Sequence, residues 1–318
     1  MKKTNIRILL ICISSSLLLF NCKKDDDDDP INADTYSSLN DLVQALKPNT
    51  QSFTIDPTTS QTVTGADGTI ISISANAFTD DNSNIILTPI TVKLREHLTL
   101  EDMLLANAQT SSANQILVTG GSFNLTFADE NGSSVNVDPW KLQAEIPVLT
   151  DITGYENQMQ YYQGESSIVD GREMVDWDLG SNGEAWIDQG VFNIFGLVQG
   201  LSNCDVLYDM SGDTPTQFEV EVFGVTDYSS TTVWMVIDDF PSVIMITSLN
   251  DTMTALKTYE GSISTGLNAT LIAITVDADS YLKFGSLPIT VLGDDIFNVV
   301  VDYGTTEELT ALIQNITN

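Results

Sequence analysis

GSFNLTFADENGSSVNV, residues 121–137, is the stretch that indicates the fold most strongly. Phe123, Leu125 and Phe127 alternate with polar residues, which is the period of a β-strand with one buried face. Asn131-Gly132 follows, and this pair favours a tight turn because both residues tolerate a positive φ. Apolar residues then return at every second position, so the stretch predicts a β-hairpin.

Short alternating segments recur on both sides of this stretch, separated by Gly, Asn and Asp. This pattern predicts an all-β chain built from two β-sandwich-like domains with few short helices. The expected strands are SFTID (52–56), GTIISISANAF (68–78), PITVKLRE (89–96), KLQAEIPV (141–148), MQYYQ (159–163), EMVDWD (173–178), VFNIFGL (191–197), CDVLY (204–208), QFEVEVFG (217–224), TVWMVID (232–238), SVIMIT (242–247), TLIAITVD (270–277) and IFNVVVD (296–302).

Three segments instead carry helical spacing, at 38–46, 99–107 and 305–316. Ser38 and Thr99 are suitable N-caps, and Thr305 with Glu308 forms a capping-box pattern. We expect the first helix to dock on the first domain. Helix should account for less than about 15% of the chain, against a usual 30–35%.

Domain limits follow from changes in composition. PVLTDITGYEN, with Pro147 and Gly154, separates two strand-rich blocks and predicts a junction near 148–158. The expected organisation is a signal peptide at 1–21, a tether at 22–37, a β-sandwich domain at 38–150 and a second β-rich domain at 151–318.

The segment TVTGADGTIISISANAFTDDNSNIILTPITVKLRE resembles the ZU-five-type β-sandwich domain of ankyrins and netrin receptors, over about residues 50–150. The residues that fill the places of that degenerate motif are Gly68, Ile71, Ile73, Ala75, Ala77, Phe78, Val92, Leu94 and Glu96. Some relatives of this family cleave themselves at a His-Phe-Ser element. Here His97 is followed by Leu98 and Thr99, so the resemblance does not imply self-cleavage.

The N-terminus has the layout of a secretory signal. Lys2, Lys3 and Arg7 precede an apolar run from Ile8 to Phe20. An uncleaved anchor helix is the alternative, but the run is shorter than the roughly 20 residues that span a bilayer. The run ends at Cys22, and Leu19 to Cys22 resembles a bacterial lipobox, although Phe20 and Asn21 replace the usual small residues. We therefore predict cleavage before Cys22 and its lipidation, which anchors the chain in a membrane.

A run of aspartates follows the predicted lipidation site. Such a run repels itself and stays solvated, so it is at least an acidic spacer. Cys-Lys-Lys-Asp-Asp-Asp also resembles the export signal of Bacteroidota lipoproteins that reach the outer face of the outer membrane, and this interpretation is favoured. The predicted export-signal residues are Lys23, Lys24, Asp25, Asp26, Asp27, Asp28 and Asp29.

Charge limits the possible partners. The formal net charge of −32 becomes about −35 when cleavage removes three basic and no acidic residues. Phosphate neutralisation needs many Lys and Arg side chains, so nucleic acid is excluded as a partner. Three cysteines are present, and Cys204 alone remains once Cys12 leaves with the signal and Cys22 takes lipid. We therefore expect no intrachain disulfide, and Cys204 is interpreted as a small core residue.

Signals for catalysis are weak. The one histidine, His97, is interpreted as a surface residue at a strand end, and no Gly-x-Ser-x-Gly motif accompanies it. One His and one free Cys do not make a zinc site, and no glycine-rich phosphate loop is present. The sequence predicts no catalytic residue, no cofactor and no metal.

The segment VDWDLGSNGEAW holds the best calcium candidate. Asp176, Asp178, Asn182 and Glu184 supply oxygen ligands, but their order is not that of an EF-hand. Trp177 and Trp186 in the same segment could stack on a sugar. A solvated loop with core tryptophans is the favoured interpretation.

These observations predict a surface-exposed lipoprotein of the outer membrane that is not an enzyme. It would act as a binding or scaffolding module at the cell envelope, with a glycan or an envelope protein as ligand. The alternative is a carbohydrate-active accessory protein or a hydrolase that uses carboxylates.

Overall fold

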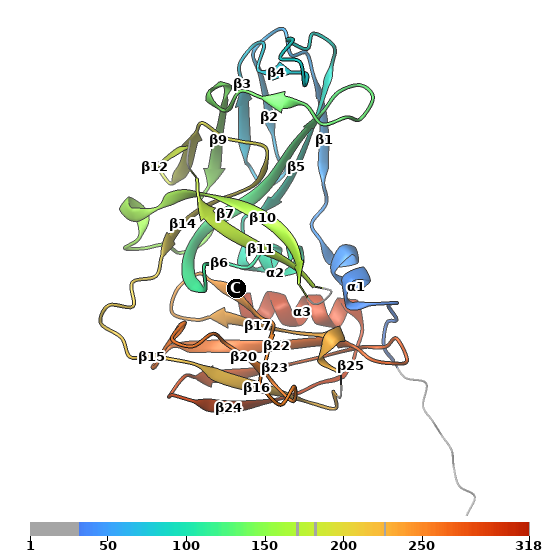
Figure 1. Ribbon diagram of the computed structural model, residues 1–318, viewed down its shortest axis with the longest axis vertical. Helices are drawn as coiled ribbons and strands as arrows, with labels where there is room; N and C mark the ends of the chain where they lie inside the picture. Colours follow the sequence, from blue (N-terminus) through green and yellow to red (C-terminus); the bar gives the residue numbers. More distant parts are fainter. Residues whose placement is uncertain (1–31, 170–171, 181–182, 226, 318) are drawn as a thin grey trace, which may run out of the picture. The chain divides into compact units, whose positions relative to one another are not determined.

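Two β-sandwiches and three short helices make up the part of the chain that the structure describes. The computed structural model describes residues 32–169, 172–180, 183–225 and 227–317, which belong to one unit, Asn32–Asn318 (Figure 1). The predictions for the signal peptide, Cys22 and the export-signal residues lie outside these residues. The expected all-β class with few short helices is confirmed.

The first sandwich is formed by two mainly antiparallel sheets with residues between 51 and 207. One sheet has the order β1-β5-β7-β14-β10-β11, with β6 also paired to β7, and the other has the order β12-β13-β9-β3-β2. Their bounds are β1 (Gln51–Ile55), β2 (Gln61–Thr64), β3 (Ile70–Ile73), β5 (Ile90–His97), β6 (Ser111–Ser112), β7 (Gln115–Ala128), β9 (Leu142–Pro147), β10 (Gln160–Val169), β11 (Arg172–Leu179), β12 (Glu184–Asp188), β13 (Val191–Phe195) and β14 (Gly200–Leu207).

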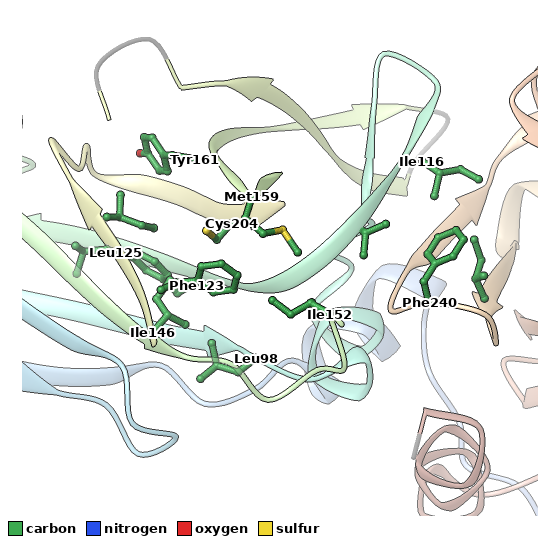
Figure 2. Packing of buried hydrophobic residues seen from close by; sticks show 14 of the residues in the cluster. Leu98, Ile116, Phe123, Leu125, Ile146, Ile152, Met159, Tyr161, Cys204 and Phe240 are labelled. Carbon is green, nitrogen blue, oxygen red and sulfur yellow. The ribbon is translucent and has the colours of Figure 1, made fainter. Parts of the chain in front are cut away.

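Alternate residues of the two sheets meet in the core of this sandwich. Figure 2 shows Phe123 and Leu125 of β7 close to Ile146 of β9 and Cys204 of β14. All four side chains are fully buried, as the period of two in their strands requires.

The second sandwich contains residues from 215 to 303. One sheet has the order β18-β17-β22-β23-β25, and the other has the order β19-β20-β16-β24, in which β16 and β24 are parallel. Their bounds are β16 (Phe218–Phe223), β17 (Thr231–Ile237), β18 (Val243–Ile246), β19 (Ser248–Leu249), β20 (Leu256–Lys257), β22 (Asn268–Val276), β23 (Leu282–Thr290), β24 (Asp295–Val300) and β25 (Asp302–Tyr303). Two small pairs complete the strands: β4 (Phe78–Thr79) with β8 (Asn136–Val137), and β15 (Pro215–Thr216) with β21 (Ile263–Ser264).

The strand β17 is buried along its whole length, on both of its faces. Val233 and Met235 face the core shared with β16 and β24, whereas Trp234 and Val236 belong to a second apolar cluster. That second cluster is covered by the helices α1 (Leu39–Leu46), α2 (Leu100–Ala106) and α3 (Thr306–Thr317). A strand covered on both faces has no need to alternate, which explains the continuous apolar run in its sequence.

The three predicted helices are present, with 8, 7 and 12 residues. The Ser38 and Thr99 side chains accept from the backbone amides of Asp41 and Asp102, as N-caps do. Thr305 and Glu308 make the reciprocal bonds of a capping box, at 2.8 and 3.2 Å between backbone nitrogen and side-chain oxygen. The position of α1 differs from the expectation, because Leu39 and Leu42 pack in the cluster that includes α2, α3 and the β17–β22 sheet.

The predicted hairpin at 121–137 is only partly correct. The chain turns at 129–132, where the amide of Gly132 donates to the carbonyl of Asp129 at 3.0 Å. After a single bridge between Ala128 and Ser134, however, the returning segment β8 pairs with β4 instead of β7. Val135 of the return is buried in the same core as Phe127 of β7 and Phe78 of β4, so the return still covers that core.

Three strands of four or more residues were not predicted from the sequence: β2, β12 and β23. The two-residue strands β6, β15, β19, β20 and β21 were not predicted either. In β23, Gly285 and Pro288 argue against a strand. A Cβ at Gly285 would lie 1.9 Å from the carbonyl oxygen of Val300, so the glycine allows close approach of the backbone. Pro288 pairs with Thr270 of β22, and it lies beyond the part of β23 that β25 covers on the other side.

The predicted junction near residues 148–158 does not separate two sets of strands. β9 before it pairs with β13 after it, and β7 pairs with β14. Strand membership changes instead between Leu207 and Pro215. Besides this connecting segment, backbone hydrogen bonds join the two sandwiches. The amides of Thr110 and Thr119 donate to the carbonyls of Val243 and Pro241 at 2.7 and 2.9 Å.

A buried carboxylate fastens the turn between β2 and β3. Glu96 is only 2% exposed, and its oxygens accept from Gln51 Nε2 at 2.8 Å and from the backbone amides of Asp67 and Thr69 at 3.0 and 2.8 Å. The backbone of the turn passes so close to the Glu96 carboxylate that a Cβ at Gly65 would lie 2.3 Å from Glu96 Oε2. Charge-assisted bonds of this kind satisfy amides that would otherwise be buried without a partner.

We predict that Glu96→Ala lowers the free energy of unfolding by about 3 kcal/mol or more, because it leaves three donors without their acceptor. Urea unfolding followed by circular dichroism measures this change. Glu130→Ala, at an exposed carboxylate in the 129–132 turn, is the control and should stay within about 0.5 kcal/mol of wild type. Equal stability of the two variants would contradict the role given to Glu96.

Candidate functional site

A cleft with a volume of about 310 Å³ lies between the two sandwiches. We call it the seam cleft. The first sandwich contributes the turn from β6 to β7 and part of β11, and the second contributes β18, β20 and the segment up to β21. Clefts between packed layers are common positions for ligand sites, and this volume is at the lower end of the range for small-molecule pockets.

The walls of the seam cleft combine polar residues with a group of apolar side chains. Ile116 of β7 and Met174 of β11 line it from the first sandwich, and Ile244, Met245 and Ile246 of β18 line it from the second. Thr247 Oγ1 lies 3.7 Å from the sulfur of Met174, so a direct contact joins the two sides. Methionine and isoleucine walls favour a ligand with apolar surface.

Gln109 supplies the most informative polar group in the cleft. It follows α2, whose C-cap Asn107 has the left-handed φ of 61° that turns the chain toward the seam. The side chain is 5% exposed, and its Nε2 donates to the carbonyl of Val175 at 3.0 Å. Its Oε1 finds no hydrogen-bond partner within the described parts of the chain. An unused buried acceptor beside a cleft can receive a donor from a ligand.

Trp177 fixes the position of Gln109. Its Nε1 donates to the carbonyl of Gln109 at 2.6 Å, and its ring is fully buried with Leu117, Tyr162 and Val175. The interpretation of core tryptophans is confirmed for Trp177, whose buried ring cannot stack on a sugar, but it is wrong for Trp186, which is 44% exposed. Trp177 therefore supports the cleft from beneath.

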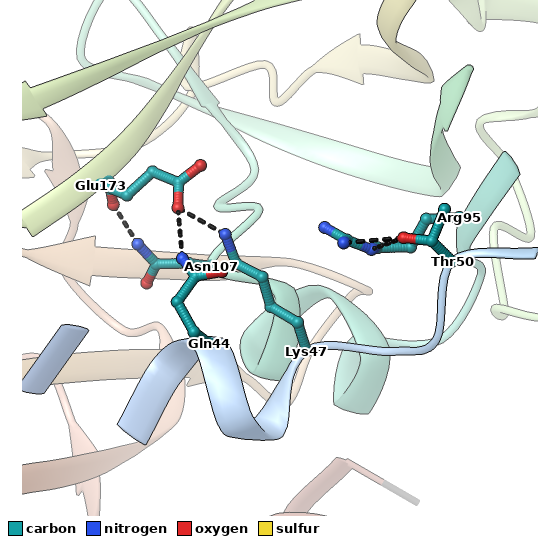
Figure 3. Close-up of polar contacts among 6 residues, drawn as sticks. All are labelled: Gln44, Lys47, Thr50, Arg95, Asn107 and Glu173. Carbon is teal, nitrogen blue, oxygen red and sulfur yellow. Dashed lines mark hydrogen bonds and ion pairs between the residues drawn. The ribbon is translucent and has the colours of Figure 1, made fainter. Parts of the chain in front are cut away.

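A polar clamp holds β11 against the helices (Figure 3). The carboxylate of Glu173 forms an ion pair with Lys47 and accepts from Gln44 Nε2 at 3.4 Å, and the carbonyl of Glu173 accepts from Asn107 Nδ2. The side chain of Lys47 is 8% exposed, so solvent screens this pair less than it would a surface pair. Figure 3 also shows Arg95 bound to Thr50, which fixes the segment between α1 and β1.

The rim of the cleft carries one cation. Lys257 lies 3.6 Å from Asp251, whose side chain is fully exposed, so this ion pair is weak. Asp176 and the half-exposed ring of Tyr259 also line the cleft. The rim thus combines polar groups of both signs with an aromatic ring, above apolar walls.

The calcium candidate is not assembled by the described residues. Asp176 and Asp178 are exposed on β11, and Glu184 is exposed on β12, while Asn182 lies outside the described residues. Among the residues that are described, no group of three or more His, Cys, Asp or Glu side chains could hold a metal ion. Asp176 instead lines the seam cleft.

The interpretation of His97 as a surface residue is wrong. His97 is 2% exposed, because α2 packs over the end of β5. Its Nδ1 lies 3.4 Å from Ser122 Oγ. Burial, followed by the positive charges of Arg95 and Lys47, lowers the pKa of His97 to about 3, so the imidazole is neutral at pH 7.

Cys204 is buried, as predicted, and burial raises the pKa of its thiol well above the usual value. Its neighbour Asp205 is a feature that the sequence did not reveal. Asp205 is fully buried next to a β-bulge in β14 and accepts from Asn203 Nδ2. Burial raises the pKa of Asp205 well above the usual carboxyl range, which favours its protonated form.

No model of a protein family matches the chain, and no curated protein matches it. In the part of the chain that is described, no helix is both long enough and apolar enough to span a membrane.

Proposed function

We propose that this protein is a surface-exposed lipoprotein, anchored through Cys22 in the outer membrane, that acts as a non-enzymatic binding module at the cell envelope. The seam cleft is its ligand site. The observation that carries the proposal is the cleft itself, which is lined by apolar side chains such as Met174 and Ile244 and by the buried Gln109, whose Oε1 has no described partner. The N-terminal signal, the lipobox-like Cys22 and the aspartate run support the location.

The histidine and the described cysteine lie away from this cleft, whereas Asp176 and Lys257 are at its rim. His97 and Cys204 are buried elsewhere, with pKa values shifted by burial toward their neutral forms. Neither residue lines the seam cleft. This arrangement favours reversible binding over nucleophilic chemistry that depends on a histidine or cysteine at the cleft.

The expected ligand is small and uncharged or weakly charged. It presents apolar surface to Met174 and Ile244 and a hydrogen-bond donor to Gln109. The large negative charge of the chain opposes the approach of anions over long distances.

We predict that the seam cleft binds N-phenyl-1-naphthylamine, a neutral fluorescent probe with two aromatic groups and one N–H donor. Ile244→Trp should fill the cleft and weaken probe binding roughly tenfold or more, because the probe loses the burial of one ring. Ile296→Trp, at an exposed position on β24, is the matched control and should bind as wild type does. Probe fluorescence measured in titrations distinguishes these outcomes, and unchanged affinity in Ile244→Trp would refute the cleft as the site.

A second prediction concerns the anchor. Cells that express the full chain should incorporate an alkynyl fatty acid into the wild-type protein but not into Cys22→Ser, because the thiol that carries the lipid is lost.

Replacing Asp25–Asp29 by alanine should keep the label but protect the protein from protease added to whole cells. Replacing them by glutamate keeps the charge and should keep the protein digestible. Labelling of Cys22→Ser, or equal digestion of the alanine and glutamate variants, would contradict the proposal.

A further inference from the structure

The sheet β12-β13-β9-β3-β2 has one face in the core and one face toward solvent. Register and burial assign the faces without ambiguity, because Ile194 of β13 pairs with Ala185 of β12 and Ala144 of β9, and Ile194 and Ala144 are fully buried. Residues one position away along each strand point outward. Glu184, Phe195 and Gln143 form one outward row, and Trp186, Asn193 and Glu145 form the next.

Three aromatic side chains gather on this outer face. Trp186 of β12 is 44% exposed, and Trp140, from the single turn of 3-10 helix just before β9, is 52% exposed. Phe195 is a neighbour of both tryptophans. It lies diagonally opposite Trp186 across β12 and β13, and its ring centroid is 5.4 Å from that of Trp140. We call these three residues the aromatic strip.

Polar side chains flank the aromatic strip on the same face. Gln143 pairs with Phe195, and Asn193 pairs with Trp186, so these two rings each have an amide beside them. Glu184 and Glu145 add carboxylates at the positions opposite Phe195 and Asn193. Amide and carboxylate groups both accept hydrogen bonds, and the amides also donate.

We propose that the outer face of β12, β13 and β9 is a binding platform for a neutral polysaccharide. Sugar rings have an apolar face of C–H groups that can lie on an indole or phenyl ring, and hydroxyl edges that bond to amides and carboxylates. Rings and amides alternate on this exposed sheet face. The rings can bind the apolar faces of the sugars in an extended polysaccharide, and the amides can bind their hydroxyl groups. Exposed aromatic side chains that gather on one face, unlike single exposed apolar residues, are typical of an interaction surface.

Charge selects a neutral polymer over an anionic one. Glu145, Glu184 and Asp188 project from this face and would repel uronic acid or sulfate groups. Lys141, the basic residue next to Trp140, donates from its Nζ to the carbonyl of Asn76 at 2.8 Å and so is held beside the turn. The net charge of −32 adds to this selection at long range.

This inference rests on the proposed function, because it names a partner class for a binding module that meets polymers outside the cell. It uses a surface separate from the seam cleft. The purified unit Asn32–Asn318, which contains all the described cores, can therefore be tested without the lipid anchor.

Affinity electrophoresis in gels that contain amylose, laminarin, xylan, galactomannan or xyloglucan tests the proposal, with alginate and polygalacturonate as anionic comparisons. At least one neutral polysaccharide should retard the wild-type unit. Trp186→Ala and Trp140→Ala should each weaken that retardation tenfold or more, whereas Trp186→Tyr, which keeps a ring, should stay within about threefold of wild type. Phe223→Ala, at a 57% exposed ring on the other sandwich, is the control and should behave as wild type.

Several results would overturn the proposal: no retardation by any neutral polysaccharide, retardation that the tryptophan variants leave unchanged, or equal retardation by alginate. Circular dichroism of each variant checks that these exposed substitutions leave the fold intact. Loss of polysaccharide binding in the tryptophan variants with retained binding of N-phenyl-1-naphthylamine separates this surface from the seam cleft. Absence of polysaccharide binding while the anchor tests succeed would refute the platform alone.

Discussion

Burial of β17 on both faces is the constraint on which the rest of the fold depends. A single strand of seven consecutive buried residues needs two apolar covers. The sheet of β16 and β24 supplies one cover through Val220 and Val299, and the three helices supply the other through residues such as Leu42 and Ile313. Because α1 precedes the first sandwich, α2 lies within it and α3 ends the chain, this cover brings together segments that are far apart in sequence.

The same constraint explains why a cleft exists between the sandwiches. The segment after α2 must leave the helix cluster and enter β6 and β7, and it does so across the edge of β18, where the amide of Thr110 bonds to Val243. Gln109 is carried to the seam by this path and is held there by Val175 and Trp177. A second contact joins the sandwiches where the chain leaves β14: Tyr208 stacks on Phe240, which lies between β17 and β18, with ring centroids 4.4 Å apart. Contacts at both places limit relative movement of the two sandwiches and keep the cleft preformed.

Local features of the fold could be predicted from the sequence, whereas pairings between distant segments could not. Ser38, Thr99 and Thr305 marked the helix starts, because caps depend on residues three positions apart. Alternation revealed most strands, but it says nothing about partners, so the strand that contains Val137 was expected to pair with β7, whereas β8 pairs with β4. His97 was placed at the surface because no local signal shows that α2 covers the end of β5. Gln109 had no signal either, since the cleft unites β11, β18 and a connecting segment.

The central claim is that the two sandwiches and the helices form one cooperative unit, with the seam cleft as a built part of it. Differential scanning calorimetry of residues 32–318 tests this claim most directly. The account predicts a single transition whose calorimetric enthalpy equals its van't Hoff enthalpy, because the apolar clusters and the bonds at the seam connect both sandwiches. Two resolved transitions, with one sandwich remaining folded after the other has melted, would contradict it.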